Sequence, residues 1–143
     1  MQKELIVRLS KTFEESAFEQ NGIEYWMARD LQALLDYTEW RNFLLVIDKA
    51  KTACVNSGQN IIDHFVDVNK TIPMPKGASK DIPDMMLTRY ACYLIAQNGD
   101  PRKEQIAFAQ SYFAIQTRKQ ELLEKRIALA ERIRAREKLA DTE

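Results

Sequence analysis

From residue 102 to residue 143 the chain contains neither glycine nor proline, the two residues that most often interrupt a helix. The simplest prediction is a single helix from Pro101 onward, roughly 40 residues and on the order of 60 Å long at 1.5 Å per residue. Residues 106–115 are apolar on nearly every side, which is typical of a helix at the centre of a fold. Residues 118–143 are rich in charge and carry a narrow apolar stripe, so we expect this second half to project.

A projecting helix with an apolar stripe usually packs on another segment or on another copy of itself, because an isolated helix gains little from propensity alone. The stripe runs either through Leu122, Leu129 and Ile133 or through Leu123, Ile127 and Ala130. The residues expected to mediate self-association, as a homodimer, are Leu122, Ile127, Leu129 and Ile133. No helix-ending signal precedes residue 143, so we expect a domain of residues 1–117 and a helix of residues 118–143 truncated from a longer protein.

A β-hairpin is predicted near the N-terminus. Asn21-Gly22 lies between Phe18 and the run of residues 23–27, and an Asn-Gly pair supplies the positive φ angles of a tight turn. The apolar segment 5–9 before it is too short for periodicity to separate a strand from a helix, so both remain open.

Residues 27–35 and 40–54 carry apolar side chains at helical spacing and predict two consecutive helices. Thr38 is the expected N-cap of the second helix, and Gly58 is expected to end it. The short link between the helices is compatible with helix-turn-helix geometry, although most such pairs simply pack a core.

Residues 65–72 and 85–87 predict a second hairpin, with a long polar tip bracketed by Pro73 and Pro83. Two lysines lie on this tip and a third lies just before it: Lys76, Lys80 and Lys70. The tip either contacts a phosphate backbone, like the wing of a winged helix, or is an ordinary solvated edge that resists aggregation. The sequence alone favours neither.

Thr88 is the expected cap of a helix through residues 90–95. After it, Gly99 suits the left-handed position that ends a helix, Asp100 can cap the next one and Pro101 fits its first turn. Together these elements predict an α+β fold that is mostly helical, with two short β-hairpins, a helix pair of helix-turn-helix type and a long C-terminal helix.

The overall charge gives no indication of nucleic acid, because 21 basic and 21 acidic residues balance. The later half leans positive: residues 1–70 carry 8 basic and 11 acidic side chains, and residues 71–143 carry 13 and 10. No apolar stretch approaches the roughly 20 residues of a membrane span, and no signal-peptide pattern is present. We therefore expect a cytoplasmic protein without membrane contact.

Enzymatic chemistry lacks its usual residues. The chain has one histidine, His64, no metal-ligand spacing and too few glycines for a phosphate-cradling loop. We therefore expect no cofactor and no metal. Cys54 and Cys92 lie among apolar neighbours in helical patterns, which favours buried free thiols over a disulfide.

Residues 24–31, with the helix after them and Tyr37, resemble the opening motif of the BRO family N-terminal domain, of the BRO/KilA-N type. Further segments resemble a family of bacterial DNA-damage-inducible proteins: residues 49–51, 53–54, 56–58, 63–65, 88–94, 97–101 and 112–118. The resemblance covers about residues 13–125. It implies a longer bacterial cytoplasmic protein of the DNA-damage response, with a DNA-binding N-terminal domain and no established catalytic motif.

The first hypothesis is therefore non-catalytic DNA binding, with Arg41 and Asn42 at the start of the second helix able to contact base edges. Thr38 and the free amides beside it are expected near phosphates. The expected nucleic-acid contacts are Arg29, Thr38, Arg41, Asn42, Lys49, Lys51, Lys76 and Lys80. The form of DNA stays open, and the near-neutral net charge predicts modest, salt-sensitive affinity.

The alternative hypothesis is protein interaction, in which the helix beyond Arg118 self-associates or docks on a repair protein or filament. DNA contact is then indirect. Four aromatic residues suit base stacking but are expected in the core: Trp26, Trp40, Tyr90 and Tyr112.

Overall fold

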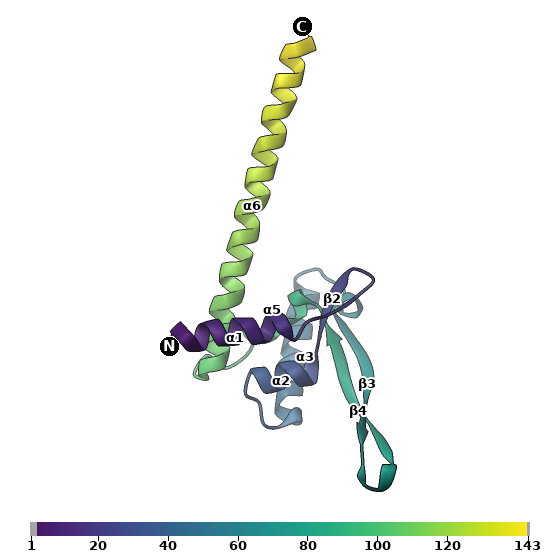
Figure 1. Ribbon diagram of the computed structural model, residues 1–143. Coiled ribbons are helices and arrows are strands. Elements are labelled where there is room, and N and C mark those ends of the chain that lie inside the picture. Colours follow the sequence, from purple (N-terminus) through teal and green to yellow (C-terminus); the bar gives the residue numbers. More distant parts are fainter. Residues whose placement is uncertain (1–2, 143) are drawn as a thin grey trace. The chain divides into compact units, whose positions relative to one another are not determined.

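The computed structural model describes residues 3–142 and has an α+β fold (Figure 1). Within those residues it contains six α-helices, a short 3₁₀ turn and a four-stranded antiparallel sheet. In chain order the elements are α1 (Lys3–Glu15), β1 (Phe18–Gln20), β2 (Ile23–Met27), α2 (Ala28–Leu34), α3 (Trp40–Asn56), α4 (Ile61–His64), β3 (Phe65–Pro73), η1 (Pro75–Gly77), β4 (Ser79–Leu87), α5 (Arg89–Gln97) and α6 (Glu104–Thr142).

The chain divides into two compact units, Met1–Gln110 and Ser111–Glu143, and the division falls inside α6. Residues 104–110 of α6 belong to the first unit, where Ile106, Phe108 and Ala109 are buried. In the second unit every side chain from residue 117 to residue 140 is exposed. The predicted long helix is confirmed, and so is the contrast between its apolar and charged halves.

The N-terminal segment that sequence patterns left undecided forms a helix, α1, with Phe13 buried near its C-terminal end. After α1, Asn21 and Gly22 form the turn between β1 and β2, with φ angles of 54° and 79°. Both angles lie in the left-handed region that a two-residue turn requires, and the pair Asn-Gly adopts it at little cost.

One sheet with the order β1-β2-β4-β3 contains all four strands, whereas the sequence suggested two separate hairpins. The strands β2 and β4 join over only two residue pairs, Trp26 with Leu87 and Met27 with Met86. This pairing is between segments far apart in the chain, so local turn signals do not reveal it.

The expectation of a long tip between β3 and β4 is wrong. β4 begins at Ser79 and continues through Pro83, which pairs with Asn69, so only Met74–Ala78 lie between the strands. A proline is tolerated here because β4 pairs with β2 only at Met86 and Leu87, so Pro83 interrupts no second ladder. The result is a two-stranded ribbon of nine residue pairs that extends away from the helices of the first unit (Figure 1).

Thr38 does not cap α3, contrary to expectation. The residue before the first helical position is Glu39, which has extended backbone angles and makes no side-chain cap bond, so Thr38 lies one residue too early. At the other end Gly58, with φ of 82°, ends α3 as predicted. The amides of Gly58 and Gln59 bond to the carbonyls of Val55 and Cys54, the arrangement of a Schellman motif.

The Thr88 cap of α5 is confirmed, because its hydroxyl oxygen accepts a hydrogen bond of 3.2 Å from the amide of Ala91. The expectation for the next junction is partly wrong. α6 begins at Glu104 rather than Pro101, and Gly99 does not have a positive φ. Asp100 instead accepts bonds from the amide and guanidinium of Arg102, which hold the pKa of its carboxyl at about 2.

The requirement for glycine at position 99 is one of space. A Cβ there would lie 3.0 Å from both Cδ1 and Cγ2 of Ile106 and 3.3 Å from the Tyr37 hydroxyl oxygen. These atoms belong to buried or half-buried side chains that join the junction to α6 and to the α2–α3 link. The glycine therefore allows a close approach of three segments.

We expect Gly99→Ala to lower the free energy of unfolding by about 1–3 kcal/mol, because the added methyl overpacks this contact. Urea unfolding followed by circular dichroism measures the change. In an Ile106→Val background, which removes one of the two opposing atoms, the cost of Gly99→Ala should fall. An undiminished cost in that background would contradict the explanation.

Trp26 is a core residue, as predicted. It is 1% exposed, its ring stacks on Phe13 at 4.5 Å between centroids, and its Nε1 donates a 2.8 Å hydrogen bond to the Phe13 carbonyl. The three other aromatic residues assigned to the core, Trp40, Tyr90 and Tyr112, are half-buried.

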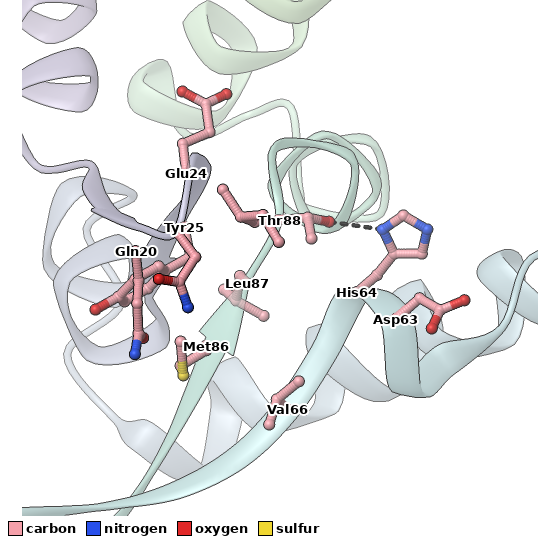
Figure 2. Close-up of a pocket in the computed structure, with 11 residues that line it drawn as sticks. Gln20, Glu24, Tyr25, Asp63, His64, Val66, Met86, Leu87 and Thr88 are labelled. Carbon is pink, nitrogen blue, oxygen red and sulfur yellow. Dashed lines mark hydrogen bonds between the residues drawn. The ribbon is translucent and has the colours of Figure 1, made fainter.

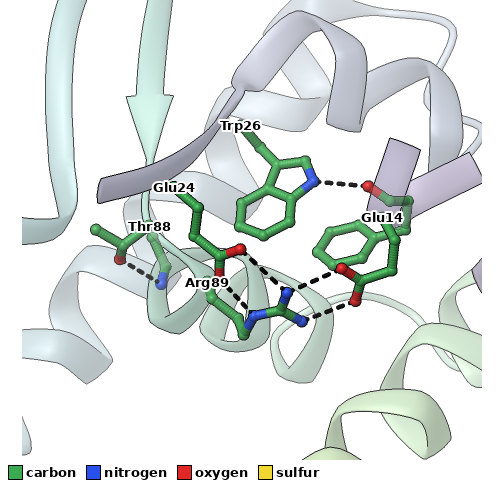
Figure 3. Close-up of polar contacts among 7 residues, drawn as sticks. Glu14, Glu24, Trp26, Thr88 and Arg89 are labelled. Carbon is green, nitrogen blue, oxygen red and sulfur yellow. Dashed lines mark hydrogen bonds and ion pairs between the residues drawn. The ribbon is translucent and has the colours of Figure 1, made fainter. Parts of the chain in front are cut away.

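Arg89, at the start of α5, ties three elements together beside Trp26 (Figure 3). Its two terminal nitrogens each lie 2.9 Å from a Glu14 carboxylate oxygen, and its Nε lies 2.8 Å from Glu24. The guanidinium carbon lies 5.0 Å from the centre of the Trp26 ring. Because one guanidinium pairs with two carboxylates, Arg89 fixes α1, β2 and α5 relative to one another.

Candidate nucleic-acid interface

The exposed face of α3 carries a polar surface opposite its buried residues, which are Phe43, Ile47, Ala50 and Cys54. Arg41, Asn42 and Lys49 are all exposed on it. At about 100° per residue, Arg41 and Lys49 lie only about 80° apart around the helix. Lys51 is half-buried and lies about 160° from Lys49, so these two lysines point in different directions. Thr38 is exposed just before the helix.

Arg29 is held by contacts inside the fold. Its Nε donates a 2.8 Å hydrogen bond to the Pro83 carbonyl of β4, and its guanidinium carbon lies 4.1 Å from the centre of the Trp40 ring. Arg29 therefore joins α2 to the ribbon and to the first residue of α3. It thereby positions α3 and the ribbon relative to each other.

The contact between α2 and the ribbon includes a buried carboxylate that sequence reasoning missed. Asp84 is 2% exposed, and its Oδ1 accepts hydrogen bonds of 3.1 Å from the Arg29 amide and 2.8 Å from the Met85 amide. Met27, the N-cap residue of α2, has no side-chain cap bond, so Asp84 satisfies this helix end from another strand. No local sequence signal identifies a cap supplied by tertiary contact.

The ribbon has two different faces, which follow from its register. Lys70 pairs with Ile82 and Ile72 pairs with Lys80, so alternation places these four side chains on one face. We call this the lysine face. Both lysines are exposed and both isoleucines are half-buried. Lys76 is exposed at the tip, in the left-handed region with φ of 64°.

The opposite face of the ribbon is acidic and polar. Thr71 pairs with Asp81, and Asp67 lies four residues before Thr71 on the same strand face. The Thr71 hydroxyl donates a 2.7 Å hydrogen bond to Asp81. A polyanion would be attracted to the lysine face and repelled by this one.

Two groups among the cations of the first unit differ in their contacts. One group has partners: Arg89 pairs with two glutamates, Arg102 pairs with the neighbouring Asp100 at the surface, and Lys103 contacts the Asp36 carbonyl and the Tyr37 ring. In the other group, no hydrogen bond or ion pair is seen within residues 3–142 for the side chains of Arg41, Lys49, Lys70, Lys76 and Lys80. The second group is available to a ligand.

A separate pocket of about 340 Å³ opens beside the junction of β2 and β4 (Figure 2). Val66, Met86 and Leu87 contribute apolar surface and Asp63 contributes a carboxylate, with no lysine or arginine in the lining. Glu24 also lines the pocket, but its carboxylate is paired with Arg89. His64 lies here, its Nδ1 2.7 Å from the Thr88 hydroxyl and its ring 4.8 Å from that of Tyr90. A pocket without lysine or arginine does not suit a phosphate, so we do not count it as part of the candidate interface.

Other chemistry is not evident in the described part of the chain. No group of three or more His, Cys, Asp or Glu side chains among residues 3–142 could hold a metal ion. Cys54 and Cys92 are buried free thiols, as predicted, and burial raises the pKa of the Cys92 thiol far above its usual range. No described helix combines the length and hydropathy needed to cross a membrane.

Residues 16–114 match the model of a protein family described as BRO family, N-terminal domain. The chain is also similar to DNA damage-inducible protein D of Escherichia coli strain K12, with 52% identity over 102 residues. That match covers 71% of this chain and 37% of the relative, so the chain spans well under half of the relative's length. No solved structure matches the chain.

Proposed function

The chain belongs to the BRO family through its N-terminal domain, and from this premise we propose that its first unit is a non-catalytic DNA-binding module of a DNA-damage-inducible protein. The observation that carries the proposal is the division of the cations. Arg41 and Lys49 on the α3 face, and Lys70, Lys80 and Lys76 on the ribbon and its tip, make no side-chain hydrogen bond or ion pair within residues 3–142, whereas Arg89, Arg102 and Lys103 have partners. Arg8 and Lys51 also make none, but they lie on neither surface. The relative's name adds a link to DNA damage.

In this proposal α3 and the ribbon contact one duplex. Arg41 and Asn42 present the donors and acceptors that suit guanine and adenine edges, and Lys49 contacts a phosphate. The pair α2–α3 then acts as a helix-turn-helix, and the ribbon acts as its wing, with Lys76, Lys80 and also Lys70 near phosphates. A major groove admits either a helix or a two-stranded ribbon.

The other three residues predicted to contact nucleic acid, Arg29, Lys51 and Thr38, differ in their surroundings. Arg29 is better explained as the residue that positions α3 and the ribbon. Its Nε already donates to the Pro83 carbonyl, and its guanidinium lies over the Trp40 ring. Lys51 is half-buried away from the face that Arg41 and Lys49 share. Thr38 remains a proposed phosphate contact through its exposed hydroxyl, although it does not cap α3.

Fluorescence anisotropy of labelled duplex and single-stranded DNA, titrated with the protein at several salt concentrations, tests the proposal. About four to six phosphate contacts predict a slope of log K against log salt of roughly −3.6 to −5.4 for duplex DNA. Absence of binding to either form at low salt would contradict DNA binding and favour the alternative, a protein-interaction module.

A further inference from the structure

The charged part of α6 carries a narrow apolar line within the second unit. Ile115, Leu122, Leu129 and Ile133 are 55%, 39%, 51% and 47% exposed. At about 100° per residue these four side chains fall within about 40° of one another around the helix, over a length of about 27 Å. Ile127 lies about 140° from Leu122, so the expected self-association set does not form one line.

Basic side chains border this line on both sides. Within about 60° of its centre lie five exposed cations and one acid: Arg118, Lys119, Lys125, Arg126, Arg136 and Glu137. The acids Glu121, Glu124 and Glu131 lie about 100° or more away, and Glu121 pairs with Arg118 at 3.7 Å. The line of Leu and Ile is therefore the centre of a basic surface, which we call the basic seam.

A second copy of the chain is a poor occupant of the basic seam. In a parallel, in-register pair of such helices, Lys119, Arg126 and Arg136 come close to their counterparts along the contact. Like charges placed together across an interface are unfavourable and act against that pairing. The charge pattern therefore selects against a parallel homodimer through this line.

A membrane or a nucleic acid also fits less well. Helices that lie in a lipid surface present a broad apolar face, whereas an apolar line this narrow is typical of a seam between two helices. A nucleic acid would neutralise the cations but leave the Leu and Ile side chains in water. A partner that matches both the apolar line and the cations beside it has apolar residues along one line and acids on both flanks.

We propose that the basic seam of α6 binds an acidic amphipathic helix of a partner protein. The partner's apolar residues pack on Leu122, Leu129 and Ile133, and its Glu and Asp side chains lie against Lys125, Arg126 and their neighbours. This interaction is separate from the DNA contacts of the first unit, and a negative result for one does not contradict the other.

Two synthetic helical peptides test the proposal against the whole chain. Both have Leu at the a and d heptad positions; one has Glu at e and g, and the other has Lys. Anisotropy of the labelled peptides should show at least tenfold tighter binding of the Glu peptide, weakening as salt rises. Leu122→Ser with Leu129→Ser should abolish binding, and Lys125→Glu with Arg126→Glu should reverse the preference between peptides.

Glu124→Gln with Glu131→Gln, on the far side of α6, is the matched control and should leave binding of the Glu peptide unchanged. Equal binding of the two peptides, or binding of neither, would overturn the proposal. So would displacement of the Glu peptide by duplex DNA, or a stable dimer in sedimentation equilibrium that Leu122→Ser with Leu129→Ser dissociates.

Discussion

Replacing Lys70, Lys76 and Lys80 together by glutamine is expected to weaken duplex binding on the order of 100-fold near 0.1 M salt. Each lysine that neutralises one phosphate contributes about 0.9 to the slope of log K against log salt, so the slope should fall by roughly 2.7. All three side chains are exposed and none supports the core. Anisotropy titrations at three or more salt concentrations measure both quantities.

The acidic face of the same ribbon supplies the matched control. Asp67→Asn with Asp81→Asn changes two charges on the opposite side and keeps an acceptor for the Thr71 hydroxyl. We expect this variant to bind DNA as tightly as the unmodified protein or slightly more tightly. If both variants weaken binding equally, the ribbon does not present its lysine face to DNA.

Trp26→Ala is expected to cost about 3–5 kcal/mol of unfolding free energy, the usual range for removing a large buried aromatic. The side chain is 1% exposed, stacks on Phe13 and lies 5.0 Å from the Arg89 guanidinium. A cavity there also weakens the junction of α1, β2 and α5. Urea unfolding followed by circular dichroism gives the value.

Trp26→Phe is the informative companion, because it keeps an aromatic ring against Phe13 and loses the Nε1 donor to the Phe13 carbonyl. Its cost should be smaller, about 1–3 kcal/mol for the smaller ring and an unsatisfied carbonyl. A folded Trp26→Ala protein of near-normal stability that had lost DNA binding would show that the residue acts on DNA and not in the core.

Features of the fold that depend on neighbouring residues are predictable from the sequence. Gly58 ends α3 and Thr88 caps α5 because each needs only backbone groups within a few residues. The uninterrupted α6 is equally local, since it follows from the absence of Gly and Pro after Pro101.

Features that depend on tertiary contact are not predictable in this way. Position 99 requires glycine because Ile106 and Tyr37 approach it closely. Pro83 is accommodated because β2 pairs only with the end of β4. Asp84 caps a helix that begins 56 residues earlier in the chain, at Ala28. Such contacts exist only after distant segments pair.

The candidate interface shows the same division. Its residue types and the two elements that carry them follow from the sequence, but the separation of Lys70 and Lys80 from Asp67 and Asp81 requires the ribbon register. The role of Arg29 in positioning α3 and the ribbon likewise follows from its contacts with Pro83 and Trp40, which lie on other elements of the fold. A count of charges cannot separate available cations from paired ones, because it contains no geometry.

The most direct test of the account is nuclear magnetic resonance of the isotope-labelled protein titrated with a short DNA duplex. The account predicts chemical-shift changes along the exposed face of α3, including Arg41 and Lys49, and along the ribbon around Lys70 and Lys80. Changes confined to α6 or to the pocket around His64, with α3 and the ribbon unaffected, would contradict it.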